Sequence, residues 1–415
     1  MAESEKRIRV LYVCPWAHLA GHTPQAATKE PLALLEAGVE VSICTFRGIL
    51  DQKEPQVISH RSVVSSKVGF PLGILAQLLN SMPKGRYFAR FLEQVSTLYL
   101  AVKLRKPLKY DVIYLRDGDP FIFIPFVLGM FLKDYRWACS LLGSKPVRSP
   151  NSLFHKFINA PIWKPVYLRA FSKNRFAFIC EGRCLKDYFE TKFLDGILSG
   201  RISVVPLGVK RNNVNIAKRK ARQYLGLPQD KAVFLHFGTL HPDKDIETVL
   251  AAINSIPDAL LVHAGQVWPW AKRIQSVNSH SLQNNVIIRD CYIPELEKQY
   301  YFAAADAIIL SYKGDFLSPG STLWEAAKFK LPVIASDVGE LGELTKRYNF
   351  GLVFAAENAA SLKGVLFDFL NSSHDQRDSM VNNYEYFYHD FSIDTWAYNC
   401  VKVIMELYGH ASKEN

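Results

Sequence analysis

Two residues with diphosphate-binding character lie close together in the second half of the chain. The segment His236 to Lys244 reads HFGTLHPDK and leads into a helical run, Ile246–Ile253. A glycine at a strand end lets backbone N–H groups approach a phosphate, and a lysine a few residues on supplies positive charge for a diphosphate. Gly238 and Lys244 are therefore candidates, although a glycine turn with a solvated lysine would look the same.

A second candidate is the segment SPGSTLWEAA, Ser318 to Ala327, in which small residues precede a helical run. The free N–H groups and the positive dipole end of such a helix favour an anion, and Glu325 can accept hydrogen bonds from ribose hydroxyls. In the alternative interpretation, Ser321 or Thr322 caps the helix and Glu325 complements its dipole. The two interpretations are compatible, because a phosphate site uses a capped helix end.

The elements that position these residues follow a β-α-β rhythm. Apolar runs alternate with helical stretches, which predicts parallel sheets covered on both faces. The rhythm restarts after the hinge SVVPLGVKRNNVN, so we predict an α/β fold with two doubly wound Rossmann-like domains facing a central cleft. The predicted strands are Ile8–Cys14, Val39–Thr45, Val112–Leu115 and Phe176–Ile179, then Val233–Phe237, Leu260–His263, Val286–Ile288, Ala307–Leu310 and Pro332–Ala335, and a helix is predicted over Glu30–Ala37.

Composition agrees with a folded two-domain protein. The 415 residues are 49% apolar and 21% charged, and the net charge of +11 is uneven: residues 1–205 hold 29 Lys and Arg against 16 Asp and Glu. A basic domain attracts anionic lipid, an acidic polymer or nucleic acid, but no nucleic-acid motif accompanies it. The seven cysteines show no metal-site spacing, and we see no secretory signal or membrane span. We therefore expect a cytoplasmic protein without nucleic-acid partners.

The ordered segments of the second half resemble a known family. In order and spacing, SVVPLGV, FGTLHPDKDIETVLAAI, LVHAGQV, NVIIRDCYIPE, AAADAIILSY and STLWEAAKFKLPVIASDVGELGELTKRYNFGLVF resemble the C-terminal domain of glycosyltransferase family 4. EAGVEVSICT and YDVIYLRD resemble strands of its acceptor domain more loosely. The resemblance implies a GT-B fold: an acceptor-binding domain at 1–205, a nucleotide-sugar-binding domain at 206–390, and a terminal helix at 391–415 that crosses back.

The resemblance also assigns residues to the donor. It implies that Gly238 and Lys244 face the diphosphate, that Glu325 binds the ribose, and that Tyr292 and Ile293 line the nucleobase pocket. The remaining implied phosphate contacts are Gly21 and the backbone N–H groups of Gly320, Ser321 and Thr322. It implies a nucleotide-sugar as substrate, with neither a metal ion nor another cofactor.

Three positions depart from the family pattern. A second Glu is often found where this chain has Leu317, an Arg where it has Thr239, and a His at the end of the fourth strand where it has Arg116. Arg116 could stabilise a leaving diphosphate, and Asp117 or Asp119 could orient or deprotonate an acceptor hydroxyl. A surface ion pair between Arg116 and Asp117 is the competing interpretation.

A histidine near neutrality suits general acid–base chemistry, and two lie in the loop after the first strand. We rank His22 above His18 because it adjoins Gly21, although a loop histidine is often a plain polar residue. The predicted catalytic residues are thus Asp117, Arg116 and His22.

The predicted function is transfer of a sugar from a nucleotide-sugar to a glycan or lipid-linked acceptor, with retained configuration. The alternative is a catalytically silent GT-B protein that binds a nucleotide-sugar or a partner transferase, suggested by Leu317 and Thr239. Basic and aromatic residues interleave in the first domain, as around Lys84, Arg86 and Arg90. Such a stretch suits either core-facing helices or the anionic inner face of a membrane.

Overall fold

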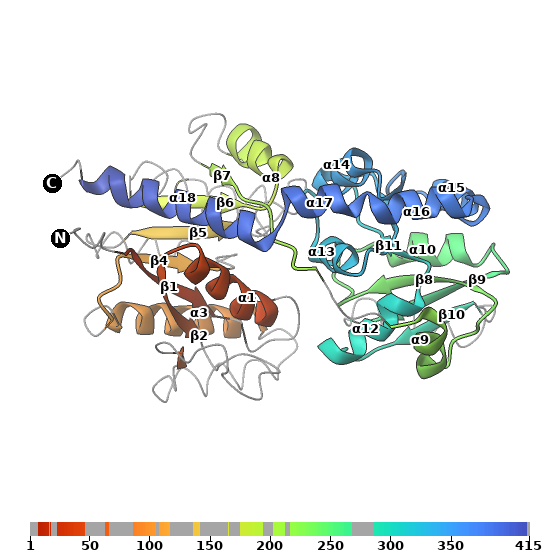
Figure 1. The fold of residues 1–415 in the computed structure, drawn as a ribbon, viewed down its shortest axis with the longest axis horizontal. Coiled ribbons are helices and arrows are strands. Elements are labelled where there is room, and N and C mark those ends of the chain that lie inside the picture. Colours follow the sequence, from red (N-terminus) through yellow and green to blue (C-terminus); the bar gives the residue numbers. More distant parts are fainter. Residues whose placement is uncertain are drawn as a thin grey trace. The chain divides into compact units, whose positions relative to one another are not determined.

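The computed structural model divides the chain into two compact units. Unit 1 comprises Met1–Pro206 with Ile393–Asn415, and unit 2 comprises Leu207–Ser392 (Figure 1). The predicted boundaries, at 205 and 390, lie one and two residues from these. The structure describes residues 7–15, 17, 23–45, 63–65, 86–104, 108–116, 136–141, 165, 175–193, 202–211, 216–267 and 285–412.

Unit 1 contains a seven-stranded parallel sheet with the order β3-β2-β1-β4-β5-β6-β7. The order reverses between β1 and β4, as in doubly wound sheets. The strands are β1 (Arg9–Cys14), β2 (Glu40–Thr45), β3 (Val63–Ser65), β4 (Val112–Leu115), β5 (Trp137–Leu141), β6 (Phe176–Cys180) and β7 (Ile202–Val204).

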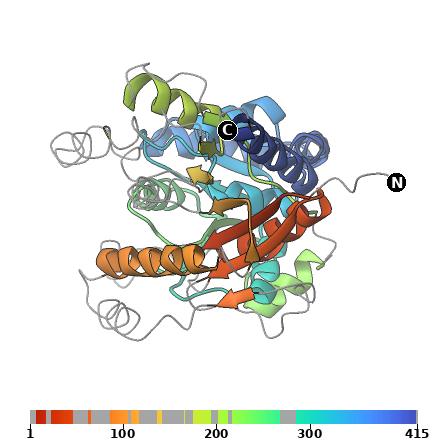
Figure 2. The same cartoon turned by 90° about the vertical axis from the view of Figure 1, so that its left-hand side faces the viewer.

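Helices cover both faces of this sheet (Figure 2). On one face lie α1 (Thr23–Glu36) and the terminal helix α18 (Ile393–Ser412), whose Trp396 meets Tyr114 of β4 edge to face. On the other face lies α3 (Arg86–Lys103), where the Cys44 thiol of β2 donates to the carbonyl oxygen of Thr97. After β6 come α8 (Arg183–Asp187) and a short π-helix at Tyr188–Phe193.

Unit 2 contains a six-stranded parallel sheet with the order β10-β9-β8-β11-β12-β13. Here the order reverses between β8 and β11, which is where ligands bind in such folds. The strands are β8 (Ala232–Phe237), β9 (Ala259–Ala264), β10 (Val286–Arg289), β11 (Ala307–Leu310), β12 (Val333–Ser336) and β13 (Gly351–Phe354).

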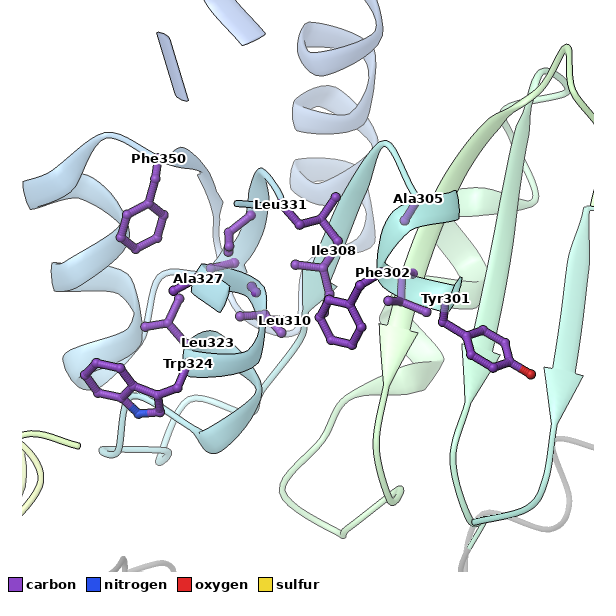
Figure 3. Close-up of a cluster of buried hydrophobic side chains, with 14 of the residues drawn as sticks. Tyr301, Phe302, Ala305, Ile308, Leu310, Leu323, Trp324, Ala327, Leu331 and Phe350 are labelled. Atoms are coloured by element: carbon purple, nitrogen blue, oxygen red, sulfur yellow. The ribbon is translucent and has the colours of Figure 1, made fainter. Parts of the chain in front are cut away.

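Both faces of the second sheet are buried, so successive residues of a strand enter different cores. In β11, Ile308 and Leu310 pack in one core, whereas Ala307 and Ile309 pack in the other. Figure 3 shows the first core, which joins β11 to α12 and α13. The helices are α9 (Lys218–Leu225), α10 (Ile246–Ile253), α12 (Glu295–Ala304), α13 (Ser321–Lys328), α14 (Gly339–Tyr348), α15 (Ala359–Asn371), α16 (His374–Asn382) and α17 (Tyr384–Asp390).

None of the helices in the described ranges combines the length and apolar content needed to cross a membrane.

Candidate functional site

Strand β8 ends beside a lysine and a hydroxyl. Gly238 follows the strand with a φ of +88°, a left-handed conformation that favours glycine. The Nζ of Lys244 donates to the carbonyl oxygen of Phe237 at 2.6 Å. A Cβ added to Gly238 would lie 3.4 Å from that Nζ and 4.0 Å from Oγ1 of Thr322 in α13. The loop after β8 and the first turn of α13 therefore bring a cation and a hydroxyl to one glycine.

Lys244 is a buried cation that forms no salt bridge with a described carboxylate. Only 6% of the residue is exposed, and within the described ranges no carboxylate forms a salt bridge with it. Burial lowers the pKa of its ammonium group to about 8, an effect that the charge of Asp243 opposes only in part. A bound anion would supply the missing charge.

The first turn of α13 supplies further donors. The helix begins after Gly320, whose φ is +75°, and no side chain caps it. A Cβ at Gly320 would lie 3.0 Å from the hydroxyl oxygen of Tyr312. The first N–H groups of a helix lack intrahelical acceptors and form its positive end. The turn that holds Ser321 and Thr322 therefore has the character of an anion site next to Gly238.

Glu325 lies on the next turn of α13 and already holds two cations. Its Oε2 lies 2.6 Å from Nζ of Lys298 in α12, and its Oε1 contacts Nζ of Lys328. Burial alone would raise the pKa of the carboxyl, but Lys328 and Lys298 outweigh that effect and lower the pKa to about 2. Although Oε2 itself is buried, 15% of the side chain remains exposed.

Strand β8 and its neighbour β9 are joined by a histidine pair. Nδ1 of His236 lies 2.9 Å from Nδ1 of His263, and Nε2 of His263 lies 3.1 Å from the carbonyl oxygen of Gly265. Burial lowers the pKa of both rings, to about 4 for His263. Neutral rings satisfy this chain when His263 donates from Nε2 and His236 donates from Nδ1. The pair fixes the ends of β8 and β9 behind Gly238.

The other predicted contacts in unit 2 lie in distinct settings. Ile293 is 7% exposed and belongs to the hydrophobic core, whereas Tyr292 before it is partly exposed. Two of the positions that depart from the family pattern, Leu317 and Thr239, are partly exposed. The Leu317 carbonyl oxygen accepts from the N–H of Glu340. The nucleobase and sugar contacts stay predictions.

In unit 1 the structure describes Arg116 but not its predicted companions. Arg116 follows β4, is 2% exposed and forms a salt bridge of 2.9 Å with Glu30 of α1, which also accepts from the hydroxyl of Tyr12 at 2.7 Å. Arg116 is thus buried, unlike a surface ion pair, and its charge is neutralised inside the unit. Its catalytic role stays a prediction. The predicted residues Gly21, His22 and Asp117 lie outside the described residues.

Sequence reasoning missed three contributors to this site. Lys298 comes from another helix, 27 positions before Glu325, and nothing local marks it as a partner. His263 and Gly265 belong to LVHAGQV, a segment noted only for its resemblance. A histidine at the end of each of two successive strands was the available signal.

Known proteins resemble part of this chain in sequence. Residues 217–386 match the family model described as Glycosyl transferases group 1. A curated relative, the putative teichuronic acid biosynthesis glycosyltransferase TuaC of Bacillus subtilis, is 28% identical over 170 residues. That alignment covers 40% of this chain and 40% of the relative's own length.

Solved structures resemble the chain over nearly its whole length. Sucrose-phosphate synthase from Thermosynechococcus elongatus superposes with a TM-score of 0.73 at 20% identity, over 97% of this chain and 100% of that one. Anabaena HepE in complex with UDP and glucose superposes with a TM-score of 0.64 at 15% identity, over 98% and 100%. These similarities show the fold, which is GT-B.

Proposed function

Because residues 217–386 form a group 1 glycosyltransferase domain, we propose that the protein transfers a sugar from a nucleotide-sugar to a glycan or lipid-linked acceptor. One observation carries the proposal: a buried Lys244, in no salt bridge with any described carboxylate, lies beside Gly238 and the first turn of α13. In this proposal the donor diphosphate lies between the lysine and the helix, and its ribose hydroxyls donate to Glu325.

The same groups would act on the leaving group. As the bond from the anomeric carbon to the diphosphate oxygen breaks, negative charge accumulates on the diphosphate. The ammonium group of Lys244 and the N–H groups of α13 are fixed dipoles and charges that stabilise it. We propose that no metal ion is required, because these groups already provide positive charge. We also propose retained configuration, as the family resemblance implies. Unit 1 would bind the acceptor.

The first test is nucleotide binding. UDP is the first ligand to try, since HepE was solved with it, followed by GDP, ADP and their sugar conjugates. Calorimetry should detect binding of one nucleotide family, and Lys244→Gln should weaken it by about tenfold or more, as expected for loss of a charge-assisted hydrogen bond. An exposed lysine offers a matched control: Lys330→Gln should bind as the wild type does. Equal affinity in Lys244→Gln would refute the site assignment.

The second test separates transfer from silent binding. A catalytically silent protein, the alternative suggested by Leu317 and Thr239, would bind the nucleotide-sugar without releasing the nucleoside diphosphate. A transferase should release it when an acceptor is supplied. Retention is then checked by NMR of the product anomer. Nucleotide binding without turnover across an acceptor panel would favour the silent function.

We also propose that the acceptor is reached at the inner, cytoplasmic face of a membrane. Support comes from the excess of basic over acidic residues in 1–205, including Arg86 and Arg90 on α3. Neutralising both together with Lys84 should reduce co-sedimentation with anionic vesicles. Wild-type protein that does not sediment with such vesicles would refute this part of the proposal.

A further inference from the structure

Four charged side chains form a continuous series between α12 and α13. Nζ of Lys298 lies 2.6 Å from Oε2 of Glu295 and 2.6 Å from Oε2 of Glu325, and Oε1 of Glu325 contacts Nζ of Lys328. We call this set, Glu295, Lys298, Glu325 and Lys328, the α12–α13 ion-pair series. Lys298 is its most buried member, with 4% of its side chain exposed, whereas Glu295 is 47% exposed. Opposite charges alternate along it.

The two helices that carry the series are held together by packing. Phe302 of α12 stacks on Phe329, which follows α13, with ring centroids 4.7 Å apart. Figure 3 shows Phe302 in the same core as Leu323 and Ala327 of α13, around β11. The backbone positions of Lys298 and Glu325 are therefore fixed by apolar contacts that do not depend on the ion pair.

Neutralising Glu325 does not by itself require Lys298. Lys328 lies one turn away on the same helix and already contacts Oε1. Replacing a buried ion pair by well-packed apolar side chains is often neutral or stabilising, so stability is a weak reason for a second, more buried lysine. What Lys298 adds is direction: with one lysine on each oxygen, the plane of the carboxylate is set. A carboxylate oxygen can accept more than one bond, and because Oε2 is buried, a further bond from a ligand would fall to Oε1.

We propose that Lys298 is a positioning residue that orients the Glu325 carboxylate toward the hydroxyls of the donor ribose and so sets a preference for ribonucleotides over 2′-deoxyribonucleotides. The inference rests on the proposed function, because it assumes that Glu325 accepts from the ribose. It adds a partner from a different helix, because Lys298 lies on α12 and Glu325 lies on α13.

The test compares affinities for UDP and 2′-deoxy-UDP by calorimetry, and for the guanine and adenine pairs if those bind instead. Loss of one hydrogen bond to a charged group lowers affinity by about tenfold or more, so the wild type should prefer the ribonucleotide by that factor. Lys298→Met should reduce this preference below about threefold, because the Glu325 carboxylate is no longer oriented toward the ribose hydroxyl. The affinity for 2′-deoxy-UDP, which lacks that hydroxyl, should change little. Lys298→Arg should restore part of the preference.

Two further variants keep the test decisive. Glu295→Gln removes the exposed partner of Lys298 without leaving a buried charge, so it should fold and should reduce the preference partly. Lys330→Met, an exposed lysine paired with Glu385, should leave the preference unchanged. A folded Lys298→Met or Glu295→Gln that keeps the full ribose preference would overturn the inference. Absence of nucleotide binding by the wild type would instead refute the proposed function.

Discussion

Replacing Lys244 by methionine should stabilise the free protein while weakening its binding of nucleoside diphosphates. The pKa of about 8, against an ordinary value of 10.5, means that burying the charged ammonium group costs about 3 kcal/mol below pH 8, at 1.36 kcal/mol per pKa unit. Methionine removes that charge and keeps much of the volume. It also leaves the Phe237 carbonyl oxygen without its donor, which costs about 1 kcal/mol.

The expected gain is thus about 2 kcal/mol, equivalent to a rise in Tm of about 4–8 °C for a unit of this size. Differential scanning calorimetry measures the gain, and isothermal titration measures UDP affinity, which should fall by about tenfold to a hundredfold. The matched control is Lys298→Met, an equally buried lysine that is paired. It should not stabilise the protein, because the charge of Lys298 is already compensated by Glu295 and Glu325.

The pH dependence of UDP binding tests whether the pKa of Lys244 is lowered. Because burial depresses the pKa of Lys244, the free protein loses this proton above about pH 8. The affinity for UDP should then fall by up to about tenfold per pH unit until the higher pKa of the complex is reached. In Lys244→Met this fall should disappear. A variant that is less stable than the wild type, or that binds UDP equally well, would refute the reasoning.

Three further predictions concern the supports of the two units. Gly265→Ala should destabilise unit 2 by more than about 2 kcal/mol in urea unfolding. The reason is that φ is +151° and the new Cβ would lie 2.3 Å from a backbone carbonyl oxygen. Gly364→Ala, where a Cβ meets open space, should instead stabilise the unit by about 0.5–1 kcal/mol. Arg116→Met should destabilise unit 1 by about 3–5 kcal/mol, because it removes the guanidinium group that compensates the buried charge of Glu30, and adding Glu30→Gln should recover most of that loss. Equal stability of the single and double variants would contradict the pairing. Burial lowers the pKa of His263 to about 4. The free energy of unfolding should therefore fall by up to about 3 kcal/mol as the pH drops from about 6.5 to 4. Constant stability over that range in urea titrations would contradict the lowered pKa.

Much of the framework was predictable because both sheets are parallel and buried. Such strands are short apolar runs bounded by polar turns, which is why β4 and β11 have the predicted bounds. The helix α10 also has its predicted bounds. Strands β3, β5, β7 and β13 were not predicted from the sequence. The sequence of β13 begins with Gly351, and a Cβ there would lie 1.9 Å from the carbonyl oxygen of Val333. Its strand character depends on that neighbour, which local sequence does not show.

In the candidate site, residues that are close in sequence were predicted, whereas partners from distant elements were not. Gly238 and Lys244 were found because they are close in sequence and lie at a strand end. Contacts made through the fold were not found: Lys298 reaches Glu325 from a separate helix, and Glu30 reaches a residue 86 positions away. Spacing along a chain indicates which backbone segments approach a ligand. It does not indicate which side chains neutralise one another.

Four lysine or arginine side chains are buried in the described ranges, namely Arg116, Arg222, Lys244 and Lys298. Three of them are neutralised within the chain, by Glu30, Asp306 and Glu325 respectively. A buried charge without a partner is strongly unfavourable, so the exception needs a reason. Lys244 lies beside Gly238 and the positive end of α13, where its neighbours also favour an anion. Among the described residues no carboxylate forms a salt bridge with Lys244. A diphosphate held by these groups would provide the counter-charge.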